Sequence, residues 1–252
     1  MAGLYDGEIA FVDQQMGRLV SWLRAKGLEK KTVLVIIGDH GEGLGSHGEG
    51  THGYFVYDYA LHVPFLVATP FSELQGVRVD SQVSAVDVFP TVLALSGIDV
   101  PGQVQGRSLL PVMLHPRTVE AEYAYSESMT PSLQFGWSPL HSLRSSRYKL
   151  IKAPRPELYD LSADPEEGTN VFDQHPAVAR DLMQRLDRLM DETSRGPRPR
   201  RRPTWTRRRS SAWPRSDTWG RPRHRGRPIP RGRSPIPRTS SASSPPFSRR
   251  AS

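Results

Sequence analysis

A short apolar run that leads directly into a cluster of aspartate, histidine and glycine constrains this chain more than any other feature. Residues 33–37 read VLVII, a mostly β-branched run with Lys30 and Lys31 before it and Gly38 after it. Such a run is typical of a β-strand that is buried on both faces. We therefore expect an α/β fold, with a strand of its main sheet at this point.

Asp39 and His40 follow this strand at the place where α/β proteins usually carry their chemistry. Ligands of open α/β sheets bind outside the carboxyl ends of the strands. Neighbouring side chains of a regular strand point to opposite faces, so Asp39 and His40 can share one ion only if the chain bends there. Gly38 and Gly41 make such a bend available, because glycine adopts turn conformations that other residues avoid. The alternative is a polar loop in which the carboxylate caps the next helix.

Histidines are concentrated in the segment that follows. Three of the eight histidines of the chain, His40, His47 and His52, fall within thirteen residues. Packing alone does not explain this density, so a chemical role is favoured. A second buried-strand candidate, residues 61–67, comes next and contains His62.

The segment GDHGEGLGSHGEGTHGYFVYDYALHVPFLV, residues 38–67, resembles the metal-binding segment of the sulfatases, which belong to the alkaline phosphatase superfamily. The resemblance implies that Asp39 and His40 ligate a divalent cation. Ca²⁺ is expected in the first place, and the histidine leaves Mn²⁺ and Zn²⁺ open. It further implies that His52 binds the sulfate group or protonates the leaving group. His47 and His62 would bind substrate or support the metal ligands.

A second stretch, RSSRYKLIKAPRPELYDLSADPEEGTNV at residues 144–171, resembles the C-terminal subdomain of sulfatases. Closely spaced strand-like pieces predict a small antiparallel sheet here. An amphipathic helix over residues 176–190 is expected to close it. Together the two matches favour a sulfatase over phosphodiesterases and cofactor-independent mutases of the same superfamily. The predicted strands are 121–125, 140–144, 148–151 and 158–161.

Two further helices are predicted before this sheet. Residues 5–26 have apolar side chains at helical spacing, which predicts one buried face and an end at Gly27. Residues 83–95 predict a helix that starts or kinks around Pro90. Asp87 is interpreted as a carboxylate at the helix start rather than as a site residue.

Composition divides the chain into two unlike parts. The formal net charge is +8, but residues 196–252 hold seventeen Arg, no Lys and one acid, so the preceding residues are acidic overall. The arginine-rich part has no apolar periodicity, and we predict that it is disordered. One reading is an RNA- or DNA-binding tail. The other, which we favour, is a reading frame translated out of register, so nucleic acid is not the partner we expect.

Several classes of protein are disfavoured by composition. Cysteine is absent, which excludes a disulfide framework and thiolate metal ligands. No apolar stretch approaches the roughly 20 residues that a membrane-spanning helix requires, and no signal peptide is visible at the start. The sequence carries no signal for compartment or oligomeric state.

The resemblance also shows what this sequence lacks. Sulfatases use a formylglycine made from the first residue of a Cys/Ser-x-Pro-x-Arg motif, and this chain has no such match. We therefore expect the C-terminal portion of a sulfatase, without the nucleophile-bearing half, that acts on small-molecule or glycan sulfate esters. A phosphatase or phosphodiesterase of the superfamily is the alternative enzyme, and a non-catalytic protein with a nucleic-acid-binding tail is the alternative class. The expected parts are a partial alkaline-phosphatase-like mixed sheet with flanking helices (1–118), an antiparallel subdomain with a C-terminal helix (119–194) and a disordered tail (195–252).

Overall fold

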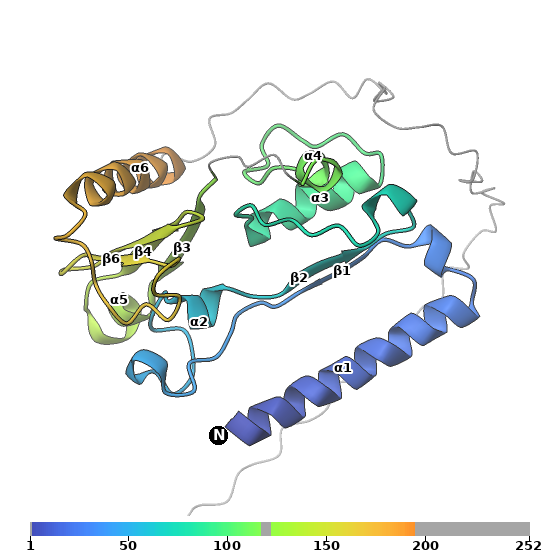
Figure 1. Ribbon diagram of the computed structural model, residues 1–252, viewed down its shortest axis with the longest axis horizontal. Helices are drawn as coiled ribbons and strands as arrows, with labels where there is room; N and C mark the ends of the chain where they lie inside the picture. The colour runs from blue at the N-terminus through green and yellow to red at the C-terminus, as the bar shows by residue number, and fades with distance from the viewer. Residues whose placement is uncertain (1, 117–121, 195–252) are drawn as a thin grey trace, which may run out of the picture. The chain divides into compact units, whose positions relative to one another are not determined.

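The computed structural model describes residues 2–116 and 122–194, which form helices and two small antiparallel sheets (Figure 1). This arrangement confirms the α/β class expected from the sequence. The arginine-rich segment 195–252, for which disorder was predicted, lies outside the described residues. So does the predicted boundary near residue 118.

The strand that carries the Asp-His pair belongs to a two-stranded antiparallel sheet. Strand β1 (Leu34–Ile37) is half-buried along its whole length, so the expectation of burial on both faces was wrong. Strand β2 (Phe65–Ala68), which pairs with β1, explains this partial burial. Its Phe65 and Val67 pack against an apolar cluster, whereas Leu66 is 56% exposed on the other face. Within the described residues this sheet is covered on one face only. The paired residues are Leu34 with Ala68, Val35 with Val67, Ile36 with Leu66 and Ile37 with Phe65.

Two short helices supply the apolar cluster under this sheet. Helix α3 (Val88–Leu95) begins just before Pro90, as predicted, because proline is tolerated in the first turn of a helix. Gly97 has a φ of 68° and lies just beyond the end of α3. Helix α4 (Leu110–Leu114) completes the cluster. Its buried residues are Leu74, Leu95, Leu109, Val112 and Met113.

Asp87 is buried, and each of its two carboxylate oxygens accepts a hydrogen bond from a backbone N–H. The N–H of Ser84 donates to Asp87 Oδ2 at 3.0 Å, and the N–H of Arg107 donates to Oδ1 at 2.9 Å. Ser84 and Asp87 form a reciprocal capping box at the start of the helical segment. The structural interpretation of this carboxylate is therefore confirmed.

Helix α1 (Ala2–Ala25) extends along almost all of the range predicted for it. Gly27 adopts a φ of 65° and the Leu28 N–H returns to the Leu23 carbonyl at 2.9 Å, which ends the helix in the predicted way. The predicted buried face, however, is not observed. Ile9, for example, is 53% exposed, since the described residues do not cover the apolar stripe of α1.

The second sheet has four antiparallel strands in the order β3-β4-β5-β6. The prediction of an antiparallel sheet is confirmed, with β4 at the predicted bounds and the other strands shifted by one to three residues. Residue 121, part of the first predicted strand, lies outside the described range. The strands are β3 (Ala124–Ser128), β4 (Leu140–Arg144), β5 (Tyr148–Lys152) and β6 (Glu157–Asp160), and helix α5 (Thr130–Phe135) lies between β3 and β4.

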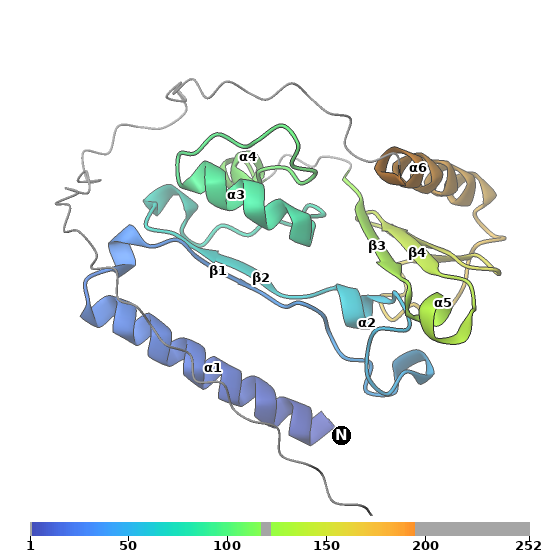
Figure 2. The ribbon, with the colours of Figure 1, turned by 180° about the vertical axis from the view of Figure 1, so that it is seen from behind.

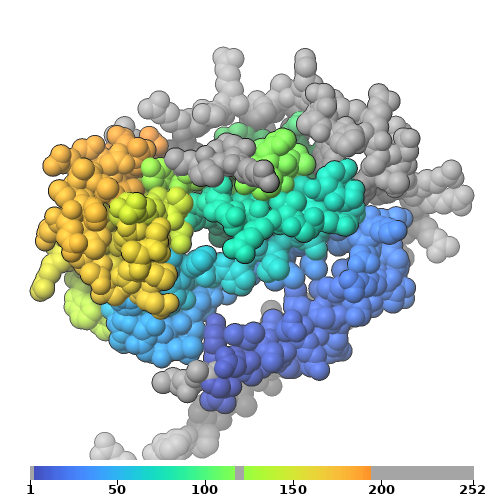
Figure 3. Space-filling model, viewed as in Figure 1, coloured from blue at the N-terminus to red at the C-terminus, as the bar shows by residue number. Residues whose placement is uncertain are grey.

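Helix α6 (Pro176–Ser194) packs on one face of this sheet, as the sequence predicted (Figures 1 and 2). The apolar side chains of α6 recur about every 3.6 residues and form a stripe along one side of the helix. Side chains on one face of a strand recur every second residue, so the stripe and the strand residues that face it form a common core. Figure 3 shows the orange atoms of α6 directly against the yellow atoms of the strands. The fully buried members are Leu143, Leu150, Leu158, Ala179, Leu182 and Leu186.

Short helical turns connect these elements. The turns are η1 (Glu29–Lys31), η2 (Ser46–Gly48), α2 (Asp58–Leu61), η3 (Ser72–Leu74) and η4 (Ala85–Asp87).

None of the helices in the described ranges is long and apolar enough to cross a membrane.

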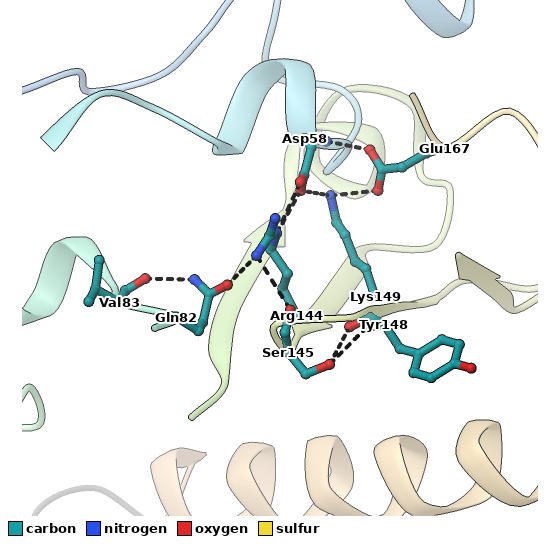
Figure 4. Close-up of polar contacts among 8 residues, drawn as sticks. All are labelled: Asp58, Gln82, Val83, Arg144, Ser145, Tyr148, Lys149 and Glu167. Atoms are coloured by element: carbon teal, nitrogen blue, oxygen red, sulfur yellow. Dashed lines mark hydrogen bonds and ion pairs between the residues drawn. The ribbon is translucent and has the colours of Figure 1, made fainter. Parts of the chain in front are cut away.

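A buried ion cluster joins α2 to the second sheet (Figure 4). The side chain of Lys149, on β5, is completely buried, and its Nζ lies 2.8 Å from Asp58 Oδ1 and 2.9 Å from Glu167 Oε1. Arg144 Nε lies 3.0 Å from Asp58 Oδ2, and its Nη1 donates to Gln82. One lysine thus holds together residues from three separate parts of the sequence.

The two carboxylates of this cluster are electrostatically unlike. Burial raises the pKa of the Glu167 carboxyl, against the opposing effect of the Lys149 ammonium. Burial acts in the same direction on Asp58, but the charges of Lys149 and Arg144 outweigh it and hold the pKa of Asp58 below its usual value. Asp58 therefore stays ionised to a lower pH than an ordinary aspartate and balances the charge of the buried lysine.

We predict that Lys149→Met destabilises the chain by about 3–5 kcal/mol, because it leaves the buried Glu167 without its cation and leaves Asp58 with Arg144 alone. The free energy of unfolding is obtained from urea titrations followed by circular dichroism.

Lys152→Met is the matched control, because Lys152 lies on the same strand but its ion pair with Asp187 is exposed, with 41% and 51% of the two side chains accessible. It should change the free energy of unfolding by less than about 1 kcal/mol. Equal losses for the two variants would contradict a special role of the buried cluster.

Candidate active site in the loop after strand β1

The end of β1 brings Asp39 and His40 together. The backbone bends at Asp39, which is the bend that the sequence argument required. As a result Asp39 Oδ2 and His40 Nε2 are 3.7 Å apart, although the residues are neighbours in sequence. The N–H of His40 donates to Asp39 Oδ1 at 3.0 Å and is the main reason why the pKa of this carboxyl is lowered. An ionised carboxylate oxygen and a ring nitrogen therefore lie side by side.

The ring of His40 is oriented by its own loop. Its Nδ1 lies 2.9 Å from the carbonyl oxygen of Gly41. A carbonyl can only accept, so Nδ1 carries the proton and the neutral ring keeps its lone pair on Nε2. Nε2 is the nitrogen that lies near Asp39 Oδ2. A backbone carbonyl on the other ring nitrogen is the usual support of a histidine that ligates a metal.

His52 lies directly against His40. The two rings stack with centroids 3.7 Å apart and planes inclined by 27°. His52 Nδ1 is 3.0 Å from Glu42 Oε2, so the carboxylate fixes the proton on Nδ1 and, in the neutral ring, leaves the lone pair on Nε2. Glu42 was not singled out from the sequence. Its position two residues after His40, inside the glycine-rich segment, was the available signal.

The glycines of this loop serve two distinct purposes. A Cβ at Gly41 would lie 1.9 Å from the carbonyl oxygen of Tyr59, so a side chain there is sterically excluded. The left-handed turns occur later, at Gly45 (φ 108°), Gly48 (φ 79°) and Gly53 (φ 100°). We predicted that Gly38 and Gly41 are needed because the backbone turns sharply there. This reason was wrong, since neither residue has a positive φ.

The other two histidines predicted as site residues lie in different surroundings. His47 stacks on Tyr57 with ring centroids 3.8 Å apart, and its Nε2 lies 3.0 Å from the carbonyl oxygen of Glu166. It thus ties the loop to the acidic turn before α6. His62 is exposed, and its backbone N–H bonds to the carbonyl of Asp58 at 2.8 Å.

Glu49 is a buried carboxylate that the sequence argument did not identify. Only 4% of Glu49 is exposed, and its carboxylate accepts from the Tyr54 N–H at 2.8 Å and from the Tyr59 hydroxyl. Its role follows from these contacts. The bond from Tyr54 to Glu49 closes the part of the loop that contains His52.

The residues present fit a divalent cation in part. Asp39 Oδ2 and His40 Nε2 offer two donor atoms on one side of the bend. Within the described ranges no cluster of three or more His, Asp or Glu side chains has metal-binding geometry. Ca²⁺ takes six to eight oxygen ligands and Mn²⁺ or Zn²⁺ at least four ligands, so this pair supplies a minority of any complete shell.

We predict that Gly41→Ala displaces the loop and separates Asp39 from His40, because the new methyl group meets the Tyr59 carbonyl. The change is followed in two-dimensional NMR spectra, in which the ring resonances of His40 and His52 should shift. Gly50→Ala is the control, since a Cβ at Gly50 meets nothing within 4 Å. Similar shifts of the histidine resonances in both variants would contradict this account of Gly41.

Comparisons with known proteins show the family of this chain. The family model described as Sulfatase matches residues 1–98, and the model described as N-sulphoglucosamine sulphohydrolase, C-terminal, matches residues 50–193. Arylsulfatase K of Bos taurus is 31% identical over 203 residues, which cover 74% of this chain and 36% of that protein. The chain thus spans about a third of the length of this relative.

Solved structures show the same likeness. A structure described as a complex with its substrate D-glucosamine-2-N,6-O-disulfate has a TM-score of 0.61 and 27% identity, and the match covers 75% of this chain and 40% of that one. A phosphonate monoester hydrolase from Silicibacter pomeroyi has a TM-score of 0.57 and 27% identity over 74% of this chain and 39% of its own. The chain belongs to the sulfatase family of the alkaline phosphatase superfamily and corresponds to part of the full-length enzyme.

Proposed function

We propose that this chain forms the metal-binding and leaving-group side of a sulfatase that hydrolyses sulfate esters of small molecules or glycans. The observation that carries the proposal is the convergence of Asp39, His40 and His52 at the end of β1. In the overall reaction, water adds to sulfur, the bond between sulfur and the ester oxygen breaks, and the products are an alcohol and hydrogen sulfate.

Asp39 and His40 would hold the divalent cation, with Ca²⁺ the first expectation and Mn²⁺ or Zn²⁺ compatible with the imidazole. The ionised carboxylate and the Nε2 lone pair point to the same side of the bend. When bound, such a cation neutralises charge on the sulfate group and on the attacking group. The sequence has no Cys/Ser-x-Pro-x-Arg motif, so we assign the nucleophile to no residue of this chain.

His52 would donate the proton that the leaving alkoxide requires. Glu42 holds its Nδ1 proton and would stabilise the imidazolium form, from which Nε2–H is the free donor. The stacked contact with His40 keeps the proton donor beside the proposed cation site. His47 and His62 contribute from further away, His47 by tying the loop to the turn at Glu166.

We predict that His40→Ala abolishes sulfate-ester hydrolysis together with loss of bound divalent metal, measured by kinetics and by elemental analysis. The variants are introduced at the gene's own locus, and the protein is purified from its source organism. His115→Ala is the control, because His115 is exposed and follows α4, outside the loop. Activity that survives His40→Ala unchanged would disprove the assignment.

The role of His52 has a separate kinetic signature in the same preparation. His52→Ala should lower kcat by about 10²–10⁴-fold for a sugar sulfate, whose alkoxide is a poor leaving group. The loss should be much smaller for 4-nitrophenyl sulfate, whose phenolate leaves without protonation. Equal losses for both substrates would assign His52 to sulfate binding instead of proton donation.

A phosphatase or phosphonate-ester hydrolase is the second candidate. It is favoured by the structural likeness to the phosphonate monoester hydrolase. Sulfate monoesters carry one negative charge and phosphonate monoesters also carry one, so the charge of the substrate does not separate the two. The ratio of kcat/KM for 4-nitrophenyl sulfate to that for 4-nitrophenyl phenylphosphonate decides between them.

A further inference from the structure

An aromatic pocket of about 590 Å³ lies between the histidine-bearing loop and the segment that links α5 to β4. Its lining includes Tyr54 from the loop, Phe135 from the end of α5 and Trp137 from the linking segment. We propose that this pocket binds the pyranose ring of a sulfated sugar. The proposal rests on the proposed function, whose substrate it narrows from sulfate esters in general to sugar sulfates.

The three rings form a connected series. Tyr54 and Phe135 have ring centroids 6.1 Å apart with planes inclined by 29°, and Phe135 and Trp137 have centroids 4.8 Å apart with planes inclined by 30°. Phe135 is 50% exposed and Trp137 is 66% exposed. Large aromatic side chains gain little stability from such positions, so a cluster of them at one pocket indicates a binding surface.

The backbone holds these rings in place before any ligand arrives. Gly136 adopts a φ of 67°, which ends α5 and reverses the chain between the two exposed rings. Its N–H bonds to the Ser132 carbonyl at 3.0 Å, and the Trp137 N–H bonds to the Pro131 carbonyl at 3.1 Å. A surface that is already ordered loses little entropy on binding.

The same loop connects the pocket to the proposed proton donor. Thr51 and Tyr54 both line the pocket, and His52 lies between them in sequence. The Gly43 N–H bonds to the Thr51 carbonyl at 2.7 Å, and the Ser128 hydroxyl donates to the Gly53 carbonyl at 2.7 Å. A ring bound in the pocket therefore contacts Thr51 and Tyr54, the lining residues on either side of His52 in the sequence.

Size and chemistry favour a sugar over other occupants. The volume falls within the roughly 300–1,000 Å³ of typical small-molecule sites. Aromatic faces pack against the C–H faces of a pyranose, while the hydroxyls of Thr51 and Ser138 among the lining residues can bond to sugar hydroxyls. The solved relative with a glucosamine disulfate is consistent with this class of ligand.

The test uses the complete 252-residue chain and a sugar without sulfate, N-acetylglucosamine, so that binding does not depend on the metal site. Saturation-transfer NMR and calorimetric titration should detect binding, with saturation reaching the sugar C–H protons. Trp137→Ala should weaken it by about tenfold or more. Trp137→Phe should retain part of the affinity, since it keeps a ring.

Leu133→Ala is the matched control, because Leu133 lies on α5, is 80% exposed and is not among the lining residues. It should leave sugar affinity unchanged. Thermal unfolding of each variant confirms that the fold is retained. The sugar assignment is overturned if N-acetylglucosamine does not bind to the unmodified chain, or if it binds equally well to Trp137→Ala. It is also overturned if the pocket binds 4-nitrophenol instead of the sugar.

Kinetics separate this proposal from the proposed function. If glucosamine 6-sulfate is hydrolysed with an unchanged KM after Trp137→Ala, the pocket proposal fails while the sulfatase function stands. If the sugar binds through Trp137 but His40→Ala leaves hydrolysis unaffected, the sugar site stands and the catalytic assignment fails. His52→Ala should leave the affinity for N-acetylglucosamine unchanged.

Discussion

The buried ammonium of Lys149 is the interaction on which the arrangement of this chain depends. It lies between Asp58, at the start of α2, and Glu167, in the turn before α6, and is completely shielded from water. A buried cation is costly unless it is paired, so these three residues must come together for the fold to be stable. The cost disfavours any other packing that buries Lys149 away from these carboxylates.

The histidine-bearing loop is held in place partly by this ion cluster. The loop begins at β1 and ends at α2, where Asp58 is fixed by Lys149. Between these ends, the loop is held by Glu49, by close backbone approach at Gly41 and by the contact of His47 with Glu166. The side chains of the proposed site are therefore positioned by contacts that take no part in the proposed reaction, which is the usual requirement for a preorganised site.

Local patterns predicted much of this structure, and tertiary contacts decided the rest. The strand β1, the antiparallel second sheet and α6 all follow from short-range periodicity and turn residues. Burial did not follow, because it depends on which element covers each face. The apolar stripe of α1 shows the limit of prediction from sequence. Periodicity identifies the apolar face of a helix but not the element that covers this face. The pairing of Lys149 with Asp58, 91 positions apart, depends on folding at a distance, and no local spacing reveals it.

The contact between His47 and Glu166 also has a consequence for how the chain comes to be folded. The two residues are separated by 119 positions, and the Asp58–Lys149 pair by 91. During synthesis β1 and its loop leave the ribosome long before the strands and the turn that hold them. Contacts between distant segments must await the later segment, and they form slowly because a long loop has to close. The proposed catalytic loop is thus made before the segments that order it.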